Sequence, residues 1–465
     1  MKWRSTLILW IVALALWSCA WSLWRVADDA RVNRLTEGFT PLFAVDSVPW
    51  NDVDGITITG SDRAALVFTR TGALLWSQVK PFKFPIDASG PLQLITDAST
   101  LSAQPMPMQF EAHSASTGLD GDAATVEFSW KGGETRIRLG RRLPAGKAWI
   151  ELVGATASAH LAPATLHDAV LGSDLTQWRQ TALFSRADID CDRIICESLD
   201  RDGKTQRLEV ARDGTMWMVV APVSTRADRG AVERWLEALT RAHANGFVAD
   251  LPTDLAVFGL ASPAATLEIH ASARRTASDG VVVVEPLVER LEIGSPVRSG
   301  AQEHFARLTA HPEAIMEIDG TAVAAAIPPS LLMIDPTASG LRPADVRAIR
   351  IEPPSGERLR IERAAGGWTL TTTDGTFAAT PARVAALLEK LCERRATEIM
   401  LGSAPAELIL GTIVLESFDG RDLAVLTVSR ERDGGRFGID DRSGVLRIFP
   451  PSTDVPFDAT GYLSE

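Results

Sequence analysis

The stretch Gly259-Leu-Ala-Ser-Pro-Ala-Ala-Thr-Leu-Glu-Ile269 aligns without a gap on Gly118-Leu-Asp-Gly-Asp-Ala-Ala-Thr-Val-Glu-Phe128. In both copies a glycine turn leads into a run in which apolar and polar residues alternate, which is typical of a strand with one buried face. Further along, Ile137-Arg-Leu-Gly140 matches Leu291-Glu-Ile-Gly294. Self-similarity at this distance along a chain indicates copies of one structural unit.

Three tryptophans, Trp76, Trp217 and Trp368, each end a passage of the same kind. The passages begin with Val53-Asp-Gly-Ile56-Thr-Ile58, Cys191-Asp-Arg-Ile194-Ile-Cys196 and Val346-Arg-Ala-Ile349-Arg-Ile351. Period-two alternation broken by turn residues predicts three consecutive strands in each copy. The third copy is less similar further on, where Ile413-Val-Leu415 and Leu426-Thr-Val428 take the places of the later strands.

An amphipathic helix is predicted after each tryptophan. Apolar residues recur at i, i+3, i+4 and i+7, which places them on one face of a helix. The clearest two stripes are Val232, Trp235, Leu236 and Leu239, and Val384, Leu387, Leu388 and Leu391. Asp228 and Thr380 stand where the N-caps of these helices are expected. In the first copy, Pro91 suits the opening turn of the corresponding helix.

The predicted fold class is therefore α+β, with three tandem modules that each combine a mainly antiparallel sheet with one principal helix. We place the modules at 49–170, 185–334 and 340–465. Each is long enough to bury its own core. The second copy is longer between Gly259 and Gly294 than the first is between Gly118 and Gly140, which predicts a longer hairpin around Ala271–Pro286.

The N-terminal region carries an uncharged run from Ser5 to Trp24, bounded by Arg4 and Arg25. As a helix, such a run spans about 30 Å, the thickness of the hydrocarbon core of a bilayer. We therefore expect a transmembrane anchor at 5–24, followed by a linker at 25–48. Two alternatives stay open, namely a signal peptide cleaved near the small residues Ser18 to Ala20 and a lipoprotein with Cys19 lipidated.

The predicted location is the inner membrane of a cell, with the C-terminal region in the periplasm. Lysine and arginine residues flank the apolar run almost equally on its two sides, so their count alone does not set the orientation. A very short tail before a long polar region favours an N-terminus inside the cytoplasm and a translocated C-terminal region.

The apolar run also carries a regular pattern of large residues. Tryptophans recur every seven positions, and the intervening residues fall four positions after each of the first three, which is the a/d pattern of a helix–helix seam. The members are Trp3, Leu7, Trp10, Leu14, Trp17, Trp21 and Trp24. We predict that this seam contacts a membrane protein, either a transporter permease or a second copy of the chain, in addition to lipid. A plain lipid-facing anchor with Trp3 and Trp24 at the interfaces is the alternative.

The overall charge and the cysteine count exclude two classes of protein. The net charge is −12 and the pI is about 5.2, which does not suit a protein that must neutralise nucleic-acid phosphates. Four cysteines in 465 residues exclude a disulfide scaffold. We therefore expect no nucleic-acid partner.

The sequence carries no recognisable catalytic motif. His-Glu-x-x-His, Gly-x-Ser-x-Gly, the P-loop and the dinucleotide turn do not occur. We expect no catalytic residue, no cofactor and no metal site. Cys191 and Cys196 stand where the other copies have aliphatic residues, and Cys392 continues the stripe of the third helix, so all three are predicted to be small buried residues.

The second copy resembles the family catalogued as domain of unknown function 4340. The resemblance rests on Trp217, Pro222, Ala227-Asp228, and Phe258-Gly259-Leu260 with Pro263. These are packing and turn residues, and the third copy lacks the proline and the Gly-Leu turn. The family has no assigned activity. The resemblance implies a membrane-anchored bacterial protein, often an auxiliary component of gliding-motility-type ABC transport systems.

The sequence favours a structural or interaction protein over an enzyme. Tandem copies of one module provide extended surfaces and several contacts at once. The leading hypothesis is a membrane-anchored scaffold or auxiliary component of an envelope or ABC-type transport complex. The alternative is an extracytoplasmic binding module for an envelope glycan or a peptide, and an enzyme comes third.

Overall fold

The computed structural model of the chain describes residues 39–463 apart from 45–46, 61–62, 73, 106–115, 155–158, 185–190, 201, 277–281 and 431–434. Within these residues, no helix is long and apolar enough to cross a membrane. The predicted anchor at 5–24 and most of the predicted linker at 25–48 lie outside the described residues.

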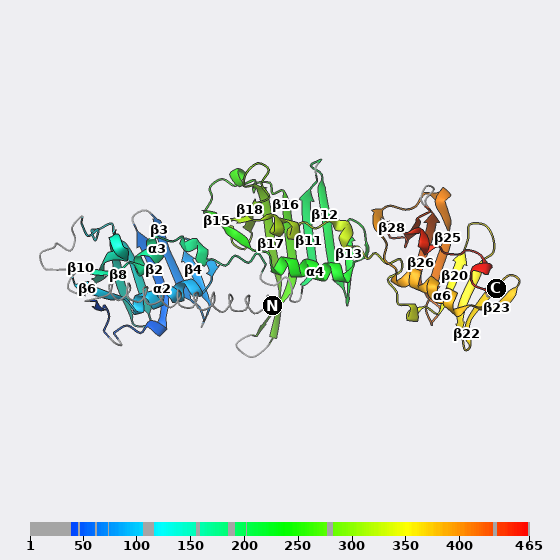
Figure 1. Ribbon diagram of the computed structural model, residues 1–465, viewed down its shortest axis with the longest axis horizontal. Coiled ribbons are helices and arrows are strands. Elements are labelled where there is room, and N and C mark those ends of the chain that lie inside the picture. The colour runs from blue at the N-terminus through cyan, green and yellow to red at the C-terminus, as the bar shows by residue number, and fades with distance from the viewer. Residues whose placement is uncertain are drawn as a thin grey trace, which may run out of the picture. The chain divides into compact units, whose positions relative to one another are not determined.

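Two compact units divide the chain between Gln180 and Thr181. The first unit contains one β-sheet and the second contains two, and Figure 1 draws them in blue, in green and in yellow to red. The paired strands of all three sheets are antiparallel, and a helix packs on each sheet, so the α+β class is confirmed. The module boundaries at 49–170, 185–334 and 340–465 stay predictions.

The first sheet has ten strands in the order β1-β6-β10-β9-β8-β7-β2-β3-β4-β5. Its strands are β1 (Thr40–Pro41), β2 (Val53–Gly60), β3 (Arg63–Arg70), β4 (Trp76–Lys80), β5 (Phe84–Ile86), β6 (Ser102–Pro105), β7 (Ala124–Trp130), β8 (Gly133–Leu143), β9 (Lys147–Val153) and β10 (Ala159–Pro163). Its helical segments are η1 (Trp50–Asp52), α2 (Ser89–Ser99), η2 (Pro144–Gly146), α3 (Thr165–Leu171) and η3 (Leu175–Trp178).

The second sheet has nine strands in the order β14-β13-β12-β11-β16-β17-β18-β19-β15. Its strands are β11 (Cys191–Leu199), β12 (Thr205–Asp213), β13 (Met216–Ala221), β14 (Thr225–Arg226), β15 (Ala244–Asp250), β16 (Ala265–Thr276), β17 (Val282–Pro296), β18 (His304–Leu308) and β19 (Ala314–Ile318). Its helical segments are α4 (Arg229–Thr240), η4 (Ala256–Phe258), α5 (Gly320–Ala326) and η5 (Ser330–Met333).

The third sheet also has nine strands, in the order β23-β22-β21-β20-β25-β26-β27-β28-β24. Its strands are β20 (Ala348–Glu352), β21 (Leu359–Ala364), β22 (Gly367–Thr372), β23 (Gly375–Ala379), β24 (Glu398–Leu401), β25 (Ile409–Glu416), β26 (Asp422–Arg430), β27 (Phe437–Asp440) and β28 (Val445–Phe449). Its helical segments are η6 (Pro343–Asp345), α6 (Pro381–Leu388), the π-helix η7 (Glu389–Glu393), η8 (Ala406–Leu408), η9 (Pro451–Thr453) and η10 (Ala459–Gly461).

The three sheets share one strand order. Four strands form a first meander, the chain passes through the principal helix, and a fifth strand forms on the far side of the sheet. The next four strands form a second meander, whose first strand pairs with the first strand of the first meander and whose last strand pairs with the fifth strand. This order repeats even where the third copy is poorly matched in sequence, and β1 is an addition to the first sheet.

The principal helices α2, α4 and α6 each bury the stripe of apolar residues that faces their own sheet. The stripes predicted for α4 and for α6 with η7 are buried, as is Pro91 of α2. Asp228 caps α4 by accepting hydrogen bonds from the N–H groups of Gly230 and Ala231. Thr380 occupies the N-cap position of α6, but its hydroxyl makes no capping hydrogen bond. Pro381 follows it, and a proline at this position already fixes the backbone for the first helical turn.

The matched glycines of the first two sheets meet the same steric demands. Gly118 and Gly259 have φ values of +64° and +68°, in the left-handed region that favours glycine. A Cβ on Gly140 would lie 2.4 Å from the carbonyl oxygen of Thr117, and one on Gly294 would lie 2.1 Å from that of Phe258. The gapless match therefore reflects one turn whose backbone crosses another segment too closely for a side chain.

The long hairpin expected around Ala271–Pro286 is confirmed as β16 and β17, which pair from Ala265–Ile293 to Thr276–Val282. The buried position of the cysteines is also confirmed. Cys191, Cys196 and Cys392 are buried and free of disulfides. Cys191 and Cys196 both face the core because the register shifts at the start of β11. Burial raises the pKa of the Cys191 thiol to about 11 and that of Cys196 to about 12.

Each sheet is closed by a segment that returns to the start of its principal helix. A residue one or two positions before the helix donates its backbone N–H to this segment: Asp87 to Trp178 O at 2.6 Å, Asp228 to Met333 O at 2.8 Å, and Thr380 to Tyr462 O at 2.8 Å. Another segment lies beside the start of the fifth strand of each sheet. Its backbone hydrogen bonds include Leu42 N to Leu101 O, Leu183 N to Ala242 O, and Ala396 N to Pro336 O.

Gly294→Ala tests the close crossing in the second sheet. The added methyl group meets the backbone oxygen of Phe258, so we expect a loss of about 1–3 kcal/mol in unfolding free energy, as for other overpacked sites. The measurement is thermal unfolding followed by circular dichroism. Gly246→Ala, in β15 of the same sheet, is the control because nothing lies within 4 Å of its added Cβ. Equal melting temperatures for the two variants would contradict the assignment.

Candidate functional site

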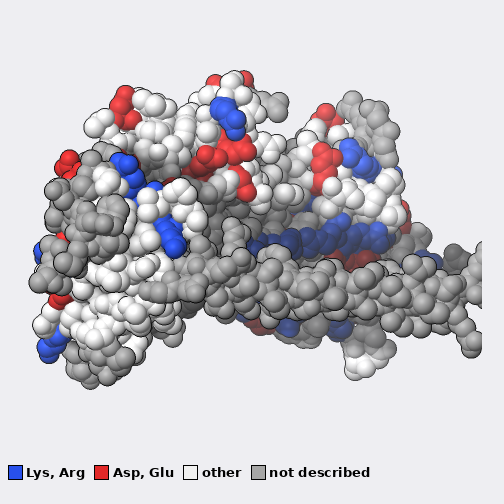
Figure 2. Space-filling view, turned by 60° about the vertical axis from the view of Figure 1, so that its left-hand side comes forward, with Lys and Arg blue, Asp and Glu red and all other residues white. Residues whose placement is uncertain are grey.

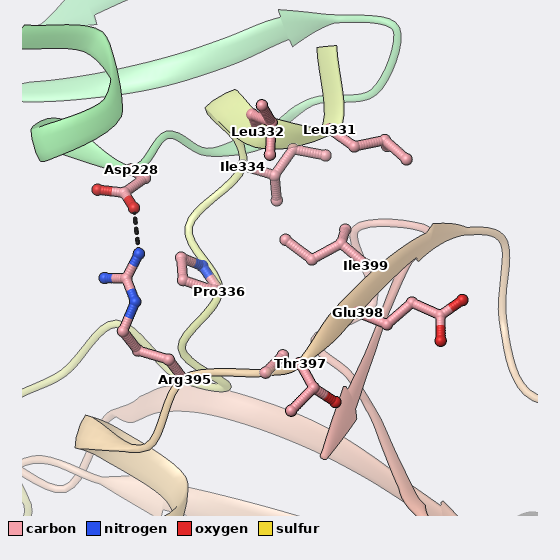
Figure 3. Close-up of a pocket in the computed structure, with 10 residues that line it drawn as sticks. Asp228, Leu331, Leu332, Ile334, Pro336, Arg395, Thr397, Glu398 and Ile399 are labelled. Atoms are coloured by element: carbon pink, nitrogen blue, oxygen red, sulfur yellow. Dashed lines mark hydrogen bonds and ion pairs between the residues drawn. The ribbon is translucent and has the colours of Figure 1, made fainter. Parts of the chain in front are cut away.

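A groove lies between the second and third sheets of the second unit. It has a volume of about 230 Å³. One side comes from the start of α4 and from the segment that follows η5, and the other comes from the start of β24 (Figure 3). Its lining residues are Asp228, Leu331, Leu332, Ile334, Pro336, Arg395, Ala396, Thr397, Glu398 and Ile399.

An ion pair crosses this groove between Asp228 and Arg395. Arg395 Nη2 lies 2.5 Å from Asp228 Oδ2, while the other carboxylate oxygen caps α4 (Figure 3). Burial by itself raises the pKa of Asp228, but the hydrogen bonds from Arg395 and from the N–H of Ala231 outweigh it, and the pKa lies below its ordinary value. Asp228 is therefore ionised at neutral pH and joins the two sheets. The side chain of Arg395 remains 62% exposed at the rim.

The walls of the groove are apolar. Leu331 and Ile399 pack against the core of the second sheet although Ile399 belongs to β24 of the third. Val445 of β28 is fully buried in the same cluster. Leu332 points away from this core and is 63% exposed. The second sheet therefore takes part of its core from the third, and an accessible apolar residue remains beside the groove.

Four charged residues at the same joint form a partly buried cluster, which we call the clamp: Arg226, Asp335, Asp441 and Arg447. Arg447 is fully buried in β28. Its Nε donates to the backbone oxygen of Asp335 at 2.8 Å, its Nη2 donates to Thr225 Oγ1 at 3.3 Å, and its Nη1 lies 3.1 Å from Asp441 Oδ1. A guanidinium of the third sheet thus donates two of its hydrogen bonds to the second sheet and to the segment that follows it.

Arg226 completes the clamp from the other direction. Its Nε donates to Asp335 Oδ2 and its Nη1 to Asp441 Oδ2, both at 3.2 Å. Its Nη2 donates to the backbone oxygens of Thr337 and Ala338, at 3.2 Å each. A Cβ on Gly340 would lie 2.2 Å from Arg226 Nε, so this segment passes too close to the guanidinium to carry a side chain there.

Removal of a single charged residue of the clamp should destabilise the folded protein, because its partner would stay partly buried without a counter-charge. A buried charge that loses its partner costs about 3–5 kcal/mol, because no water replaces the lost interactions. Burial by itself raises the pKa of Asp441, but the hydrogen bond from Ser443 and the charges of Arg447 and Arg226 outweigh it, so the pKa lies below its ordinary value. Both carboxylates of the clamp accept hydrogen bonds from other groups as well, which fixes their orientation.

In two further pockets, side chains that could bind a ligand already pair or pack with other residues. One of about 510 Å³ lies over the third sheet beside Arg350, Arg358 and Arg360, but two of these arginines already pair with Glu416. Another of about 480 Å³ lies between α2 and the segment around Trp178 in the first unit. The ring of Trp178 packs against Phe68, and a Cβ on Gly90 would lie 2.5 Å from the same ring, so the indole has little free face.

The faces of the sheets away from the helices carry pairs of opposite charge across neighbouring strands. Examples are Arg138 with Glu151, Arg307 with Glu292, and Arg350 with Glu416, each at 2.6 Å. Figure 2 shows red and blue side chains next to one another on the face that it draws. Such cross-strand pairs suit a solvent-facing sheet. They leave the groove as the site where apolar and charged groups from two sheets meet.

The structure does not describe the residues of the predicted site. Trp3, Leu7, Trp10, Leu14, Trp17, Trp21 and Trp24 fall outside the described residues. In the part of the chain that is described, no group of three or more His, Cys, Asp or Glu residues could hold a metal ion.

Sequence reasoning identified Asp228 only as a cap and missed the clamp. One signal was present: Arg447 interrupts the apolar strand Val445-Leu-Arg-Ile-Phe449 at a position where alternation predicts an inward residue. Its partners come from three other segments, and pairing across such sequence distances leaves no local pattern.

The fold and the groove define a chain of antiparallel α+β sheets with one repeated strand order, two of them joined by a shared core and buried charges. Residues 217–410 match the family described as Domain of unknown function (DUF4340), which confirms the resemblance seen in the sequence. The match runs from β13 to β25 and includes every residue that lines the groove. No curated protein matches the chain.

Acid should weaken the joint between the second and third sheets. The folded-state pKa of Asp441 is below its unfolded value, so its contribution to stability is present above the unfolded pKa of about 3.9 and is lost as the pH falls through the folded value. We expect the melting temperature of the second unit to hold between about pH 7 and 5 and to drop below about pH 4.

Asp441→Asn isolates the contribution of this residue. It should lower the melting temperature at neutral pH and reduce the drop in acid, because the group that titrates is gone. Differential scanning calorimetry over this pH range measures both effects. A pH dependence identical to that of the native chain would show that Asp441 does not stabilise the joint.

Proposed function

We propose that the protein is a membrane-anchored scaffold or auxiliary component that holds partner proteins and has no catalytic turnover of its own. The observation that carries the proposal is one strand order used three times, with two of the sheets joined by the clamp. Repetition multiplies contact surfaces, and a fixed spacing between surfaces lets several weak contacts act together.

The proposed setting is the inner membrane, with the sheets on the periplasmic side. What supports it is the uncharged run from Ser5 to Trp24 and the short tail before it. The proposed partner is a membrane protein, either a transporter permease or a second copy of the chain, contacted through the Trp and Leu seam. An auxiliary role in an ABC-type transport system is the specific context that we propose.

A binding module for a peptide or an envelope glycan is the second candidate. The groove favours a peptide, because its lining combines the apolar residues Leu331, Leu332 and Ile399 with the charged residues Arg395 and Glu398. These groups suit a short extended segment with apolar side chains. Under this hypothesis the groove would bind a peptide ligand and not a partner protein. An enzyme is the least favoured reading.

Membrane topology can be tested with alkaline phosphatase fused after Glu465. The enzyme is active only outside the cytoplasm, so we expect activity if the anchor translocates the rest of the chain. A cytoplasmic fluorescent reporter at the same position is the control and should stay dark. The reverse result for both reporters would overturn the proposed orientation.

Partner capture tests the interaction through the anchor. Trp10→Leu with Trp17→Leu keeps the run apolar but removes the bulky residues of the seam. Helices in a bilayer associate through close packing, since lipid gives them little hydrophobic drive. We expect the variant to insert normally and to lose most of the co-purified membrane partner in mild detergent.

Ile11→Leu with Val12→Leu is the matched control, because these two residues lie in the same apolar run but outside the seam. It should retain the partner. Capture that is unchanged in the Trp10 and Trp17 variant, or absent in the native chain, would sink the proposed seam. Conversion of an envelope substrate by the purified protein would overturn the non-catalytic function.

A further inference from the structure

We propose that the clamp is a latch that makes the second and third sheets one rigid body. The inference does not depend on which partner the protein holds. It rests on contacts between the two sheets through Arg226, Asp335, Asp441 and Arg447. The groove lies across the same joint, so the latch also fixes the distance between its walls.

The repeated strand order supplies an internal comparison for each residue of the latch. Ile86 and Arg179 form an isolated antiparallel β-bridge in the first sheet. Ala227 and Ile334 form the corresponding bridge in the second sheet. The residues adjacent to these bridges therefore correspond, so Pro85 is the counterpart of Arg226 and Gln180 is the counterpart of Asp335. Neither counterpart carries a charge.

The two residues that the third sheet supplies also have uncharged counterparts in the second. The last two strands are β18 and β19 in the second sheet and β27 and β28 in the third. In the second sheet Ala306 pairs with Met316, and at the corresponding place in the third sheet Ile439 pairs with Arg447. Met316 is thus the counterpart of Arg447, and Leu308 is that of Asp441 by the same register.

All four charges of the latch thus stand where the preceding repeat has an uncharged residue. None is needed to build the sheet, since the same strand order forms with proline, glutamine, methionine and leucine in these places. The boundaries of the two compact units agree with this difference between charged and uncharged residues. The second and third sheets fall in one compact unit, and the boundary between units falls after Gln180. The four charged residues therefore hold the second and third sheets together and are not needed to form either sheet.

The geometry of the latch explains why it resists movement. Hydrogen bonds from a guanidinium are directional and fixed in one plane, so a rotation of one sheet against the other would misalign several at once. Arg447 is fully buried, and water does not reach it to replace a lost partner. An open joint would leave buried charges without partners, which penalises every orientation but one.

Apolar contacts and the backbone reinforce this orientation. Val445 and Ile399 of the third sheet pack against the core of the second. The connecting segment is paired on both sides, because Asp335 N donates to Arg226 O at 3.0 Å and Ala396 N donates to Pro336 O at 2.9 Å. The joint therefore has no free linker. A partner that contacts both sheets meets a preset spacing and loses little conformational freedom on binding.

Distance measurements between the two sheets test the latch. Spin labels are attached to Asp202→Cys and Asp374→Cys, which are exposed turn positions in the second and third sheets, in a full-length chain carrying Cys19→Ser. The three buried thiols are protected from labelling. We expect a single narrow distance distribution from pulsed electron spin resonance.

The latch variant combines Asp441→Leu and Arg447→Met, the residues that the second sheet carries at these positions. We expect the narrow peak to be lost and a broad distribution to replace it, while circular dichroism stays native. The matched control, Asp419→Leu with Arg421→Met, removes an exposed ion pair of the same sheet and should keep the narrow peak.

A broad distribution in the native chain would overturn the proposal, as would a narrow one in the folded latch variant. If the double variant does not fold, Asp441→Asn decides by the same criterion, because it keeps the shape of the side chain and removes its charge. A distribution that broadens equally in the control variant would also overturn the assignment to the latch.

Discussion

A fully buried guanidinium is the constraint on which the second unit depends. Arg447 lies inside the third sheet, and it donates hydrogen bonds to Thr225 and to the backbone of Asp335, which belong to the second sheet and its connecting segment. A charge in this position is tolerated only with its partners in place, so the two sheets must meet in one arrangement for either to bury its residues. The groove, the ion pair between Asp228 and Arg395, and the shared apolar core all follow from that arrangement.

The fold below this joint rests on a simpler rule that is applied three times. A meander, a helix and a second meander form one sheet, and a carbonyl of a returning segment accepts a hydrogen bond from an N–H that precedes the helix. The rule tolerates very different residues at the closing position, namely Trp178, Met333 and Tyr462. It does not tolerate side chains at Gly140 or Gly294, where one backbone passes over another. Local packing thus stabilises each sheet, and the charged residues of the clamp join the second sheet to the third.

Much of the fold could be predicted because it is local and repeated. Alternation in the strands, the helix stripes and the glycine turns each leave a short pattern, and comparison between copies strengthened every one of them. Thr380 was correctly placed at the N-cap of α6, although its hydroxyl makes no capping hydrogen bond and Pro381 follows it in the first turn. The clamp was missed because its four residues come from separate segments and no short motif joins them. The predicted seam from Trp3 to Trp24 and the membrane location stay predictions.

Calorimetry of the full-length protein tests the central claim most directly, because a rigid joint makes the second and third sheets unfold together. The account predicts two cooperative transitions, one for the unit that ends at Gln180 and one for the unit that begins at Thr181. The second transition should carry a van't Hoff enthalpy equal to its calorimetric enthalpy, as for a single cooperative unit. Three separate transitions, with the second and third sheets melting independently, would contradict it.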